Sequence, residues 1–131
     1  MTSSNLSPYK QLFDHSALEN LTQLKTGLSK LSQNHTDADA LETTHRMAHS
    51  LKGECMAMGF ESTGVLCRII EHILAKVQSN TVEITDGLLS EIQQSVEAIE
   101  RSLEKIKKEN AEENLTEYQE KLITMIGDNT I

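Results

Sequence analysis

The sequence has 131 residues, with 20 acidic and 12 basic side chains and a formal net charge of −8, and this length fits a single domain. An acidic chain with few clustered lysines and arginines is unsuited to neutralising phosphates, which excludes nucleic acid as the main partner. The longest basic cluster, residues 105–108, lies near a predicted helix end, where cations interact favourably with the helix dipole.

Two cysteines, one proline and 3% aromatic residues leave an aliphatic core of Leu, Ile, Val, Met and Ala. This composition predicts an all-α protein. The cysteines form no CxxC motif, no apolar run approaches the roughly 20 residues of a membrane span, and residues 1–5 do not resemble a signal peptide. We therefore expect a cytoplasmic protein with reduced thiols and no membrane contact.

Apolar residues at helical spacing predict a first helix from about Ser7 to Leu31. Its apolar stripe consists of Phe13, Ala17, Leu21, Leu24, Leu28 and Leu31. Gly27 falls within this stripe and lowers the local helix propensity. The polar residues 32–36 then interrupt the pattern and predict a connection.

Thr36 or Asp37 can cap a second helix, which Gly59 is expected to end. Its core side is predicted to carry Leu41, Thr44, Ala48, Leu51 and Cys55. A neighbouring stripe contains His45, His49, Lys52 and Met56. Three methionines near this stripe, at positions 47, 56 and 58, suit either an adaptable docking surface or the filling of gaps in the core.

Three more helices are predicted over about Glu61–Gln78, with Ser62 as a cap, from about Thr85, and over about Ala111–Ile126. The fourth has apolar residues at alternating steps of three and four, namely Leu89, Ile92, Val96, Ile99, Leu103 and Ile106. The short connections predict an antiparallel up-down four-helix bundle with an additional C-terminal fifth helix. Residues 1–8 are assigned to a flexible N-terminus, 9–126 to the domain, and 127–131 to a tail or the start of a linker.

The second helix places His49, Lys52 and Gly53 on one face, because residues three or four apart on a helix are neighbours. A side chain at position 53 would lean back over the imidazole, and glycine removes that cover at a cost of roughly 1 kcal/mol relative to alanine. An exposed imidazole beside an ammonium suits an anionic group such as phosphoryl. On these residues alone, a phosphoryl carrier and an ordinary surface histidine both stay open.

A histidine that accepts a phosphoryl group needs one exposed ring nitrogen and an acceptor for the other nitrogen. Glu71 is the candidate acceptor, because it lies twelve residues after Gly59 and His49 lies ten before it. Antiparallel helices joined at Gly59 would bring the two to similar heights. Arg68, one turn before Glu71, is a second candidate cation for the phosphoryl oxygens, or a charge at the bundle surface.

Two other kinds of site are compatible with the same residues. His45 and His49 have the spacing of metal ligands on one helix face, but a zinc site would need Glu71 and more as ligands, so no metal is expected. A helical-bundle interaction module whose histidine is never phosphorylated is the remaining alternative.

The segments 44–53, 58–60 and 66–71 resemble the histidine phosphotransfer domains, and most of all the N-terminal phosphotransfer domain of the chemotaxis histidine kinase CheA. The similarity extends from about Tyr9 to Ile126. It departs from the family at His45, where an aromatic residue is usual, and at Arg68, where a second histidine is usual.

The resemblance implies that His49 is phosphorylated by an ATP-binding kinase domain and passes the phosphoryl group to an aspartate of a CheY-like response regulator. It implies Glu71 as the hydrogen-bonded carboxylate and Lys52 as the supporting cation. The chain has no glycine-rich nucleotide loop, so ATP and Mg²⁺ are expected on the kinase domain and no cofactor is expected here. We expect the domain to be a monomeric phosphoryl acceptor and carrier that belongs to a CheA-like histidine kinase, although the sequence also leaves open a separate small protein.

Overall fold

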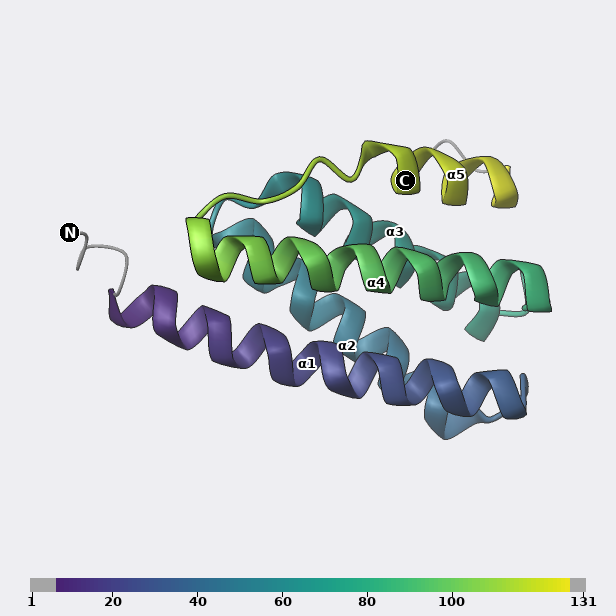
Figure 1. The fold of residues 1–131 in the computed structure, drawn as a ribbon. Helices are drawn as coiled ribbons and strands as arrows, with labels where there is room; N and C mark the ends of the chain where they lie inside the picture. The colour runs from purple at the N-terminus through teal and green to yellow at the C-terminus, as the bar shows by residue number, and fades with distance from the viewer. Residues whose placement is uncertain (1–6, 128–131) are drawn as a thin grey trace.

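The structure is a computed structural model that describes residues 7–127, which form five helices and contain no strand (Figure 1). These are α1 (Pro8–Gln33), α2 (Ala38–Ala57), α3 (Glu61–Gln78), α4 (Asp86–Glu109) and α5 (Thr116–Ile126). The predicted all-α class is thus confirmed. Most of the predicted flexible N-terminus and C-terminal tail, residues 1–6 and 128–131, lies outside the described residues, whereas Ser7 and Pro8 cap and open α1.

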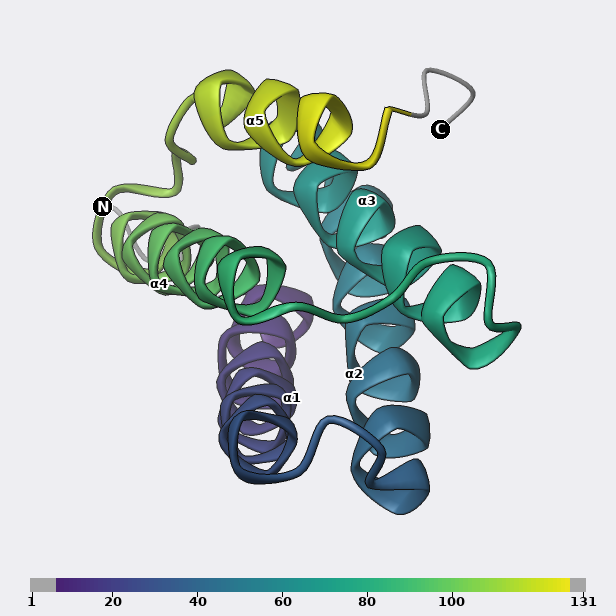
Figure 2. The same cartoon turned by 90° about the vertical axis from the view of Figure 1, so that its right-hand side faces the viewer.

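Helices α1 to α4 run alternately up and down, and α5 lies across α3 and α4 (Figures 1 and 2). Their apolar stripes meet in one aliphatic core, as the sequence pattern predicts. The largest fully buried side chains are Leu21, Leu24, Leu28, Leu31, Leu51, Leu66, Ile69, Ile70, Ile73, Leu74, Ile92 and Ile99. Because each helix buries its apolar face in this core, its polar face is the one that remains accessible for a functional site.

Side-chain caps start three of the helices. Ser7 Oγ accepts from the Lys10 amide at 3.1 Å, and Thr85 Oγ1 accepts from the Leu88 amide at 3.1 Å. Of the two candidates for α2, Asp37 is the cap, because its Oδ1 accepts from the Ala40 amide at 3.0 Å. These bonds satisfy amide groups that a helix start leaves without partners.

The turn between α2 and α3 is a Schellman motif around Gly59. This glycine has φ +82°, a left-handed conformation that costs glycine little, as the predicted helix end requires. The Phe60 amide donates to the Cys55 carbonyl at 2.8 Å, and the Gly59 amide donates to the Met56 carbonyl at 3.1 Å. The Phe60 ring then packs against Phe13, with ring centroids 5.6 Å apart. The chain is thus reversed over very few residues, so α3 returns directly alongside α2.

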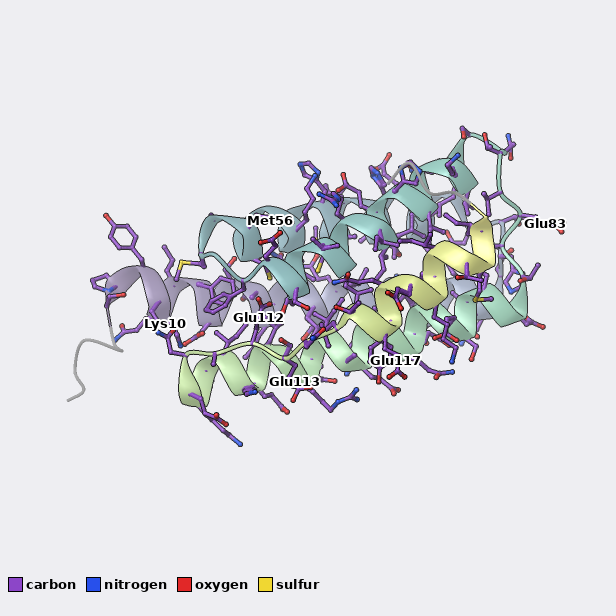
Figure 3. The ribbon with its side chains drawn as sticks, turned by 90° about the horizontal axis from the view of Figure 1, so that it is seen from above. Lys10, Met56, Glu83, Glu112, Glu113 and Glu117 are labelled. Carbon is purple, nitrogen blue, oxygen red and sulfur yellow. The ribbon has the colours of Figure 1, made fainter. Side chains whose placement is uncertain are left out.

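The predicted bounds of α3, Glu61–Gln78, are confirmed, but the prediction of its cap and that of the start of the fifth helix are wrong. Ser62 does not cap α3; its Oγ accepts from the Leu115 amide at 2.7 Å. The fifth helix starts at Thr116 rather than near Ala111, because residues 111–115 form an irregular connector along α3 and α4. Glu112 of this connector reaches the start of α3 (Figure 3), where its carboxylate accepts from the Ser62 and Thr63 amides at 3.1 and 2.8 Å. A carboxylate distant in sequence therefore caps α3, where its charge also favours the helix dipole.

Gly27 permits a close approach of α1 to α2. A Cβ atom built at this buried glycine would lie 2.2 Å from Thr44 Oγ1, a hydroxyl that also donates to the Ala40 carbonyl at 2.5 Å. The glycine that weakens the helix signal in the sequence is therefore a packing requirement of the bundle.

We expect Gly27→Ala to destabilise the domain by about 1–3 kcal/mol, because overpacking a close helix contact forces a backbone shift. In a Thr44→Ala background the clashing hydroxyl is gone, and the same substitution should be neutral or stabilising. Chemical denaturation of the four members of this mutant cycle measures the difference. If Gly27→Ala lowered the free energy of unfolding equally in both backgrounds, the proposed contact with Thr44 would be contradicted.

Candidate functional site

His49 and Glu71 face each other across the contact between α2 and α3. His49 Nδ1 lies 2.6 Å from Glu71 Oε2, although the two residues are 22 positions apart in the chain. The imidazole is open to solvent, with 62% of its side chain exposed, whereas the Glu71 side chain is only 16% exposed. The contact predicted from their distances to Gly59 is present.

Lys52 completes this cluster through the other carboxylate oxygen. Its Nζ lies 3.0 Å from Glu71 Oε1, so one carboxylate bridges the imidazole and the ammonium. Sequence spacing places Lys52 in front of His49, but the structure pairs it with Glu71 instead. Its side chain is 26% exposed, which leaves the ammonium partly open to solvent.

Burial of the Glu71 carboxyl group acts to raise its pKa, but the hydrogen bonds from Lys52 and His49 outweigh burial and hold this pKa below its ordinary value. Glu71 is therefore ionised, and an ionised carboxylate only accepts hydrogen bonds. The hydrogen between the two side chains belongs to His49 Nδ1, which leaves Nε2 of the neutral ring with its lone pair. The arrangement can supply an oriented nucleophile with a negative charge behind it.

Gly53 leaves open space beside the imidazole. A Cβ atom built there meets nothing within 4 Å, and its backbone has the ordinary conformation of a helix. Unlike Gly27, this glycine is required by no packing contact or turn. It therefore exposes helix surface one turn from His49 at a cost in stability.

The two departures from the family pattern lie at the edges of this cluster. Arg68 is exposed on α3, one turn before Glu71, and has no ion-pair partner within residues 7–127. His45 is half-buried on α2, one turn before His49. Neither contacts the carboxylate that joins His49 and Lys52, so neither disturbs that bridge.

The remaining histidines are placed differently. His15 is exposed on α1, and His35 Nε2 lies 3.1 Å from Asp86 Oδ1 at the opposite end of the bundle. His72, next to Glu71 on α3, is half-buried. In the described part of the chain no three His, Cys, Asp or Glu side chains gather as metal ligands would.

The helices that carry the site are held in place by side chains that the sequence spacing does not identify. Glu54, directly after Gly53, accepts hydrogen bonds from Ser16 and from Asn20, the latter at 2.8 Å, and so ties α2 to α1. Met47 is buried and Met56 fills the space over Gly64, where an added Cβ would lie 3.0 Å from the sulfur. Both methionines thus fill gaps between helices, one of the two roles considered for them.

Cys55 and Cys67 lie fully buried between α2 and α3, close to this cluster. A hydrogen bond with the Cys55 thiol, reinforced by burial, raises the pKa of the Cys67 thiol well above its ordinary value. Cys67 therefore remains a neutral thiol and behaves as a small buried apolar residue.

Comparison with known proteins identifies the fold and its family. The family model of the Hpt domain matches residues 8–102. The chain belongs to the Hpt domain family. Its relatives include the chemotaxis protein CheA of Halobacterium salinarum, 29% identical over 101 residues, and that of Rhizobium meliloti, 26% identical over 95 residues. These matches cover 77% and 72% of this Hpt chain but only 15% and 12% of the relatives, so the chain corresponds to a small part of each.

Solved Hpt structures share the architecture over nearly the whole chain. The solution structure of the histidine phosphotransfer domain of CheA superposes with a TM-score of 0.82 at 30% identity, covering 95% of this chain and 93% of that one. The phosphorylated P1 domain of CheA3 from R. sphaeroides, solved in complex with CheY6, has the same fold with a TM-score of 0.82 at 15% identity. The bundle with an additional fifth helix is thus confirmed. Within residues 7–127, no helix has the length and apolar character needed to cross a membrane.

The lowered pKa of Glu71 predicts a pH-dependent contribution to stability. Folding favours the ionised carboxylate, so Glu71 stabilises the folded state fully at a pH above its ordinary pKa of 4.5. This stabilisation is lost as the pH falls through the lower pKa that Glu71 has in the folded state. The difference in unfolding free energy between the native chain and Glu71→Gln should therefore shrink below pH 4.5. Urea denaturation between pH 7 and pH 3 tests this, and a difference independent of pH would contradict it.

Proposed function

We propose that this Hpt domain carries phosphoryl groups in two-component signalling of the chemotaxis type, with His49 as the phosphorylated residue. The observation that supports this assignment is the hydrogen bond from His49 Nδ1 to the Glu71 carboxylate, with the rest of the imidazole open to solvent. An exposed, oriented Nε2 is what in-line attack on a phosphorus atom requires.

In the first step, His49 Nε2 attacks the γ-phosphorus of ATP held by a separate kinase catalytic domain. The N–P bond forms, the bond to the leaving oxygen of ADP breaks, and the ring becomes positively charged. Glu71 stabilises that charge through the hydrogen bond from Nδ1. ATP and Mg²⁺ are bound by the kinase domain, and this domain contributes no cofactor of its own.

In the second step, an aspartate oxygen of a CheY-like response regulator attacks the same phosphorus atom. The N–P bond breaks and the ring returns to its neutral form. Lys52 orients Glu71, and its partly exposed ammonium can also interact with the phosphoryl oxygens. Arg68 supplies a second cation nearby. Both steps take place in the cytoplasm, with the domain acting as a monomeric carrier rather than as an enzyme.

We expect labelled ATP and a chemotaxis kinase catalytic domain to place an acid-labile label on the native chain and none on His49→Gln. His15→Gln, which removes an exposed histidine from α1, should be labelled like the native chain. Glu71→Ala should be labelled about 100-fold more slowly, because the imidazole loses its orientation and its counter-charge. Addition of a response regulator should transfer the label to its aspartate.

Equal labelling of His49→Gln and the native chain would refute the assignment of His49. Absence of label from the native chain with several kinase domains, together with retained binding of a response regulator, would instead favour an interaction module. These outcomes separate the two functions that the sequence leaves open.

Gly53 allows access to the ring to be tested separately from chemistry. Gly53→Ala should raise the free energy of unfolding by about 1 kcal/mol, because the added methyl group meets no neighbour and favours the helix. Gly53→Leu should also fold, but its side chain leans toward His49 and should slow phosphorylation. Denaturation and labelling rates measured on the same samples test this. A Gly53→Leu chain labelled at the native rate would show that the open space has no role in access.

A further inference from the structure

Helix α5 is the least embedded of the five helices. Leu122 is the single fully buried residue within Thr116–Ile126, and Met125 is 47% exposed. The helix has 11 residues, whereas isolated helices shorter than about 12–15 residues are marginal in water. α5 therefore stays helical only while it is docked on α3 and α4, as seen in the end-on view of Figure 2.

The two halves of α5 are held differently. In the first half, Gln119 Nε2 donates to the Ser62 carbonyl at 2.9 Å, and Arg101 donates to the Tyr118 hydroxyl at 2.9 Å. The connector that precedes this half is bound to α3 through the two amide bonds of Glu112. Directed hydrogen bonds thus hold the start of α5 in place.

The second half lies against a poorly compensated buried carboxylate. Glu91 of α4 is only 7% exposed, and Lys121 Nζ lies 3.6 Å from its Oε1. Among the described residues nothing forms a hydrogen bond with Glu91 Oε2, or with the hydroxyl of Ser95 one turn further along α4. Burying charge and polar groups without partners is unfavourable, so desolvation of Glu91 opposes the docking of this half.

We infer that α5 is a hinged lid, in which residues 120–126 undock and unwind while the connector stays bound to α3 through Glu112. Opening returns Glu91 to water and exposes the apolar surface of α3 and α4 beneath Leu122. No hydrogen bond or ion pair within the described chain joins α5 to His49 or Glu71, so the imidazole remains available in both states. The lid is thus independent of the proposed phosphoryl transfer.

Hydrogen–deuterium exchange of the full chain, followed by mass spectrometry, tests this inference. Amides of residues 120–126 should exchange at least about tenfold faster than those of residues 66–74 in the core of α3. Glu91→Met should slow exchange in residues 120–126 about tenfold and leave α1 and α2 unchanged, because the desolvation cost is removed. Lys121→Met should accelerate exchange in residues 120–126, whereas in the double variant Glu91→Met/Lys121→Met these residues should again exchange slowly.

Glu97→Met provides the matched control, since Glu97 is an exposed glutamate on the same helix that makes no contact with α5. Its exchange in residues 120–126 should equal that of the native chain. Exchange of α5 at the rate of the α3 core would overturn the inference. So would a Glu91→Met chain in which α5 exchange is unchanged or faster, or in which all helices slow equally.

Discussion

The tight reversal of the chain at Gly59 is the constraint on which the site depends. Because the left-handed glycine ends α2 and α3 starts two residues later, the two helices run antiparallel with a fixed register. That register brings His49 and Glu71, 22 residues apart, within 2.6 Å of each other. A shift of one helical turn, about 5.4 Å, would break this contact, so the turn determines the chemistry of a site that lies well away from it.

Polar contacts around α3 support the same register from its other side. Glu112 caps the start of this helix, and the buried Thr63 hydroxyl bonds to Ser102 of α4 at 2.8 Å and to Glu112 at 2.7 Å. On the far side of α2, Glu54 is tied to α1. The helices that carry His49 and Glu71 are therefore each attached to a neighbour by buried or half-buried hydrogen bonds. Such support limits the movement of His49 and Glu71 relative to each other more than apolar packing alone.

The sequence predicts the parts of this structure that rest on periodicity and local caps. The stripe from Leu89 to Ile106 identifies α4, and Gly59 identifies the end of α2, because helical spacing and left-handed turns restrict residue choice locally. The contact of His49 with Glu71 is predictable because both distances are counted from one short turn. The roles of the connector and of Ser62 are not predictable, since Glu112 reaches α3 from 49 positions away and no local pattern records that bond. The partner of Lys52 is missed for a related reason: spacing gives the face of a helix, but not which nearby charge a flexible side chain selects.

The burial of both cysteines has a practical consequence for the study of this domain. Cys55 and Cys67 are shielded from solvent, and the raised pKa of Cys67 keeps that thiol protonated, whereas thiol reagents attack exposed thiolates. The folded chain therefore contains two thiols but behaves toward alkylating probes as though it had none. A cysteine introduced at an exposed position such as Leu12 would therefore be the single reactive thiol, and a probe could be attached there without any change to the native core.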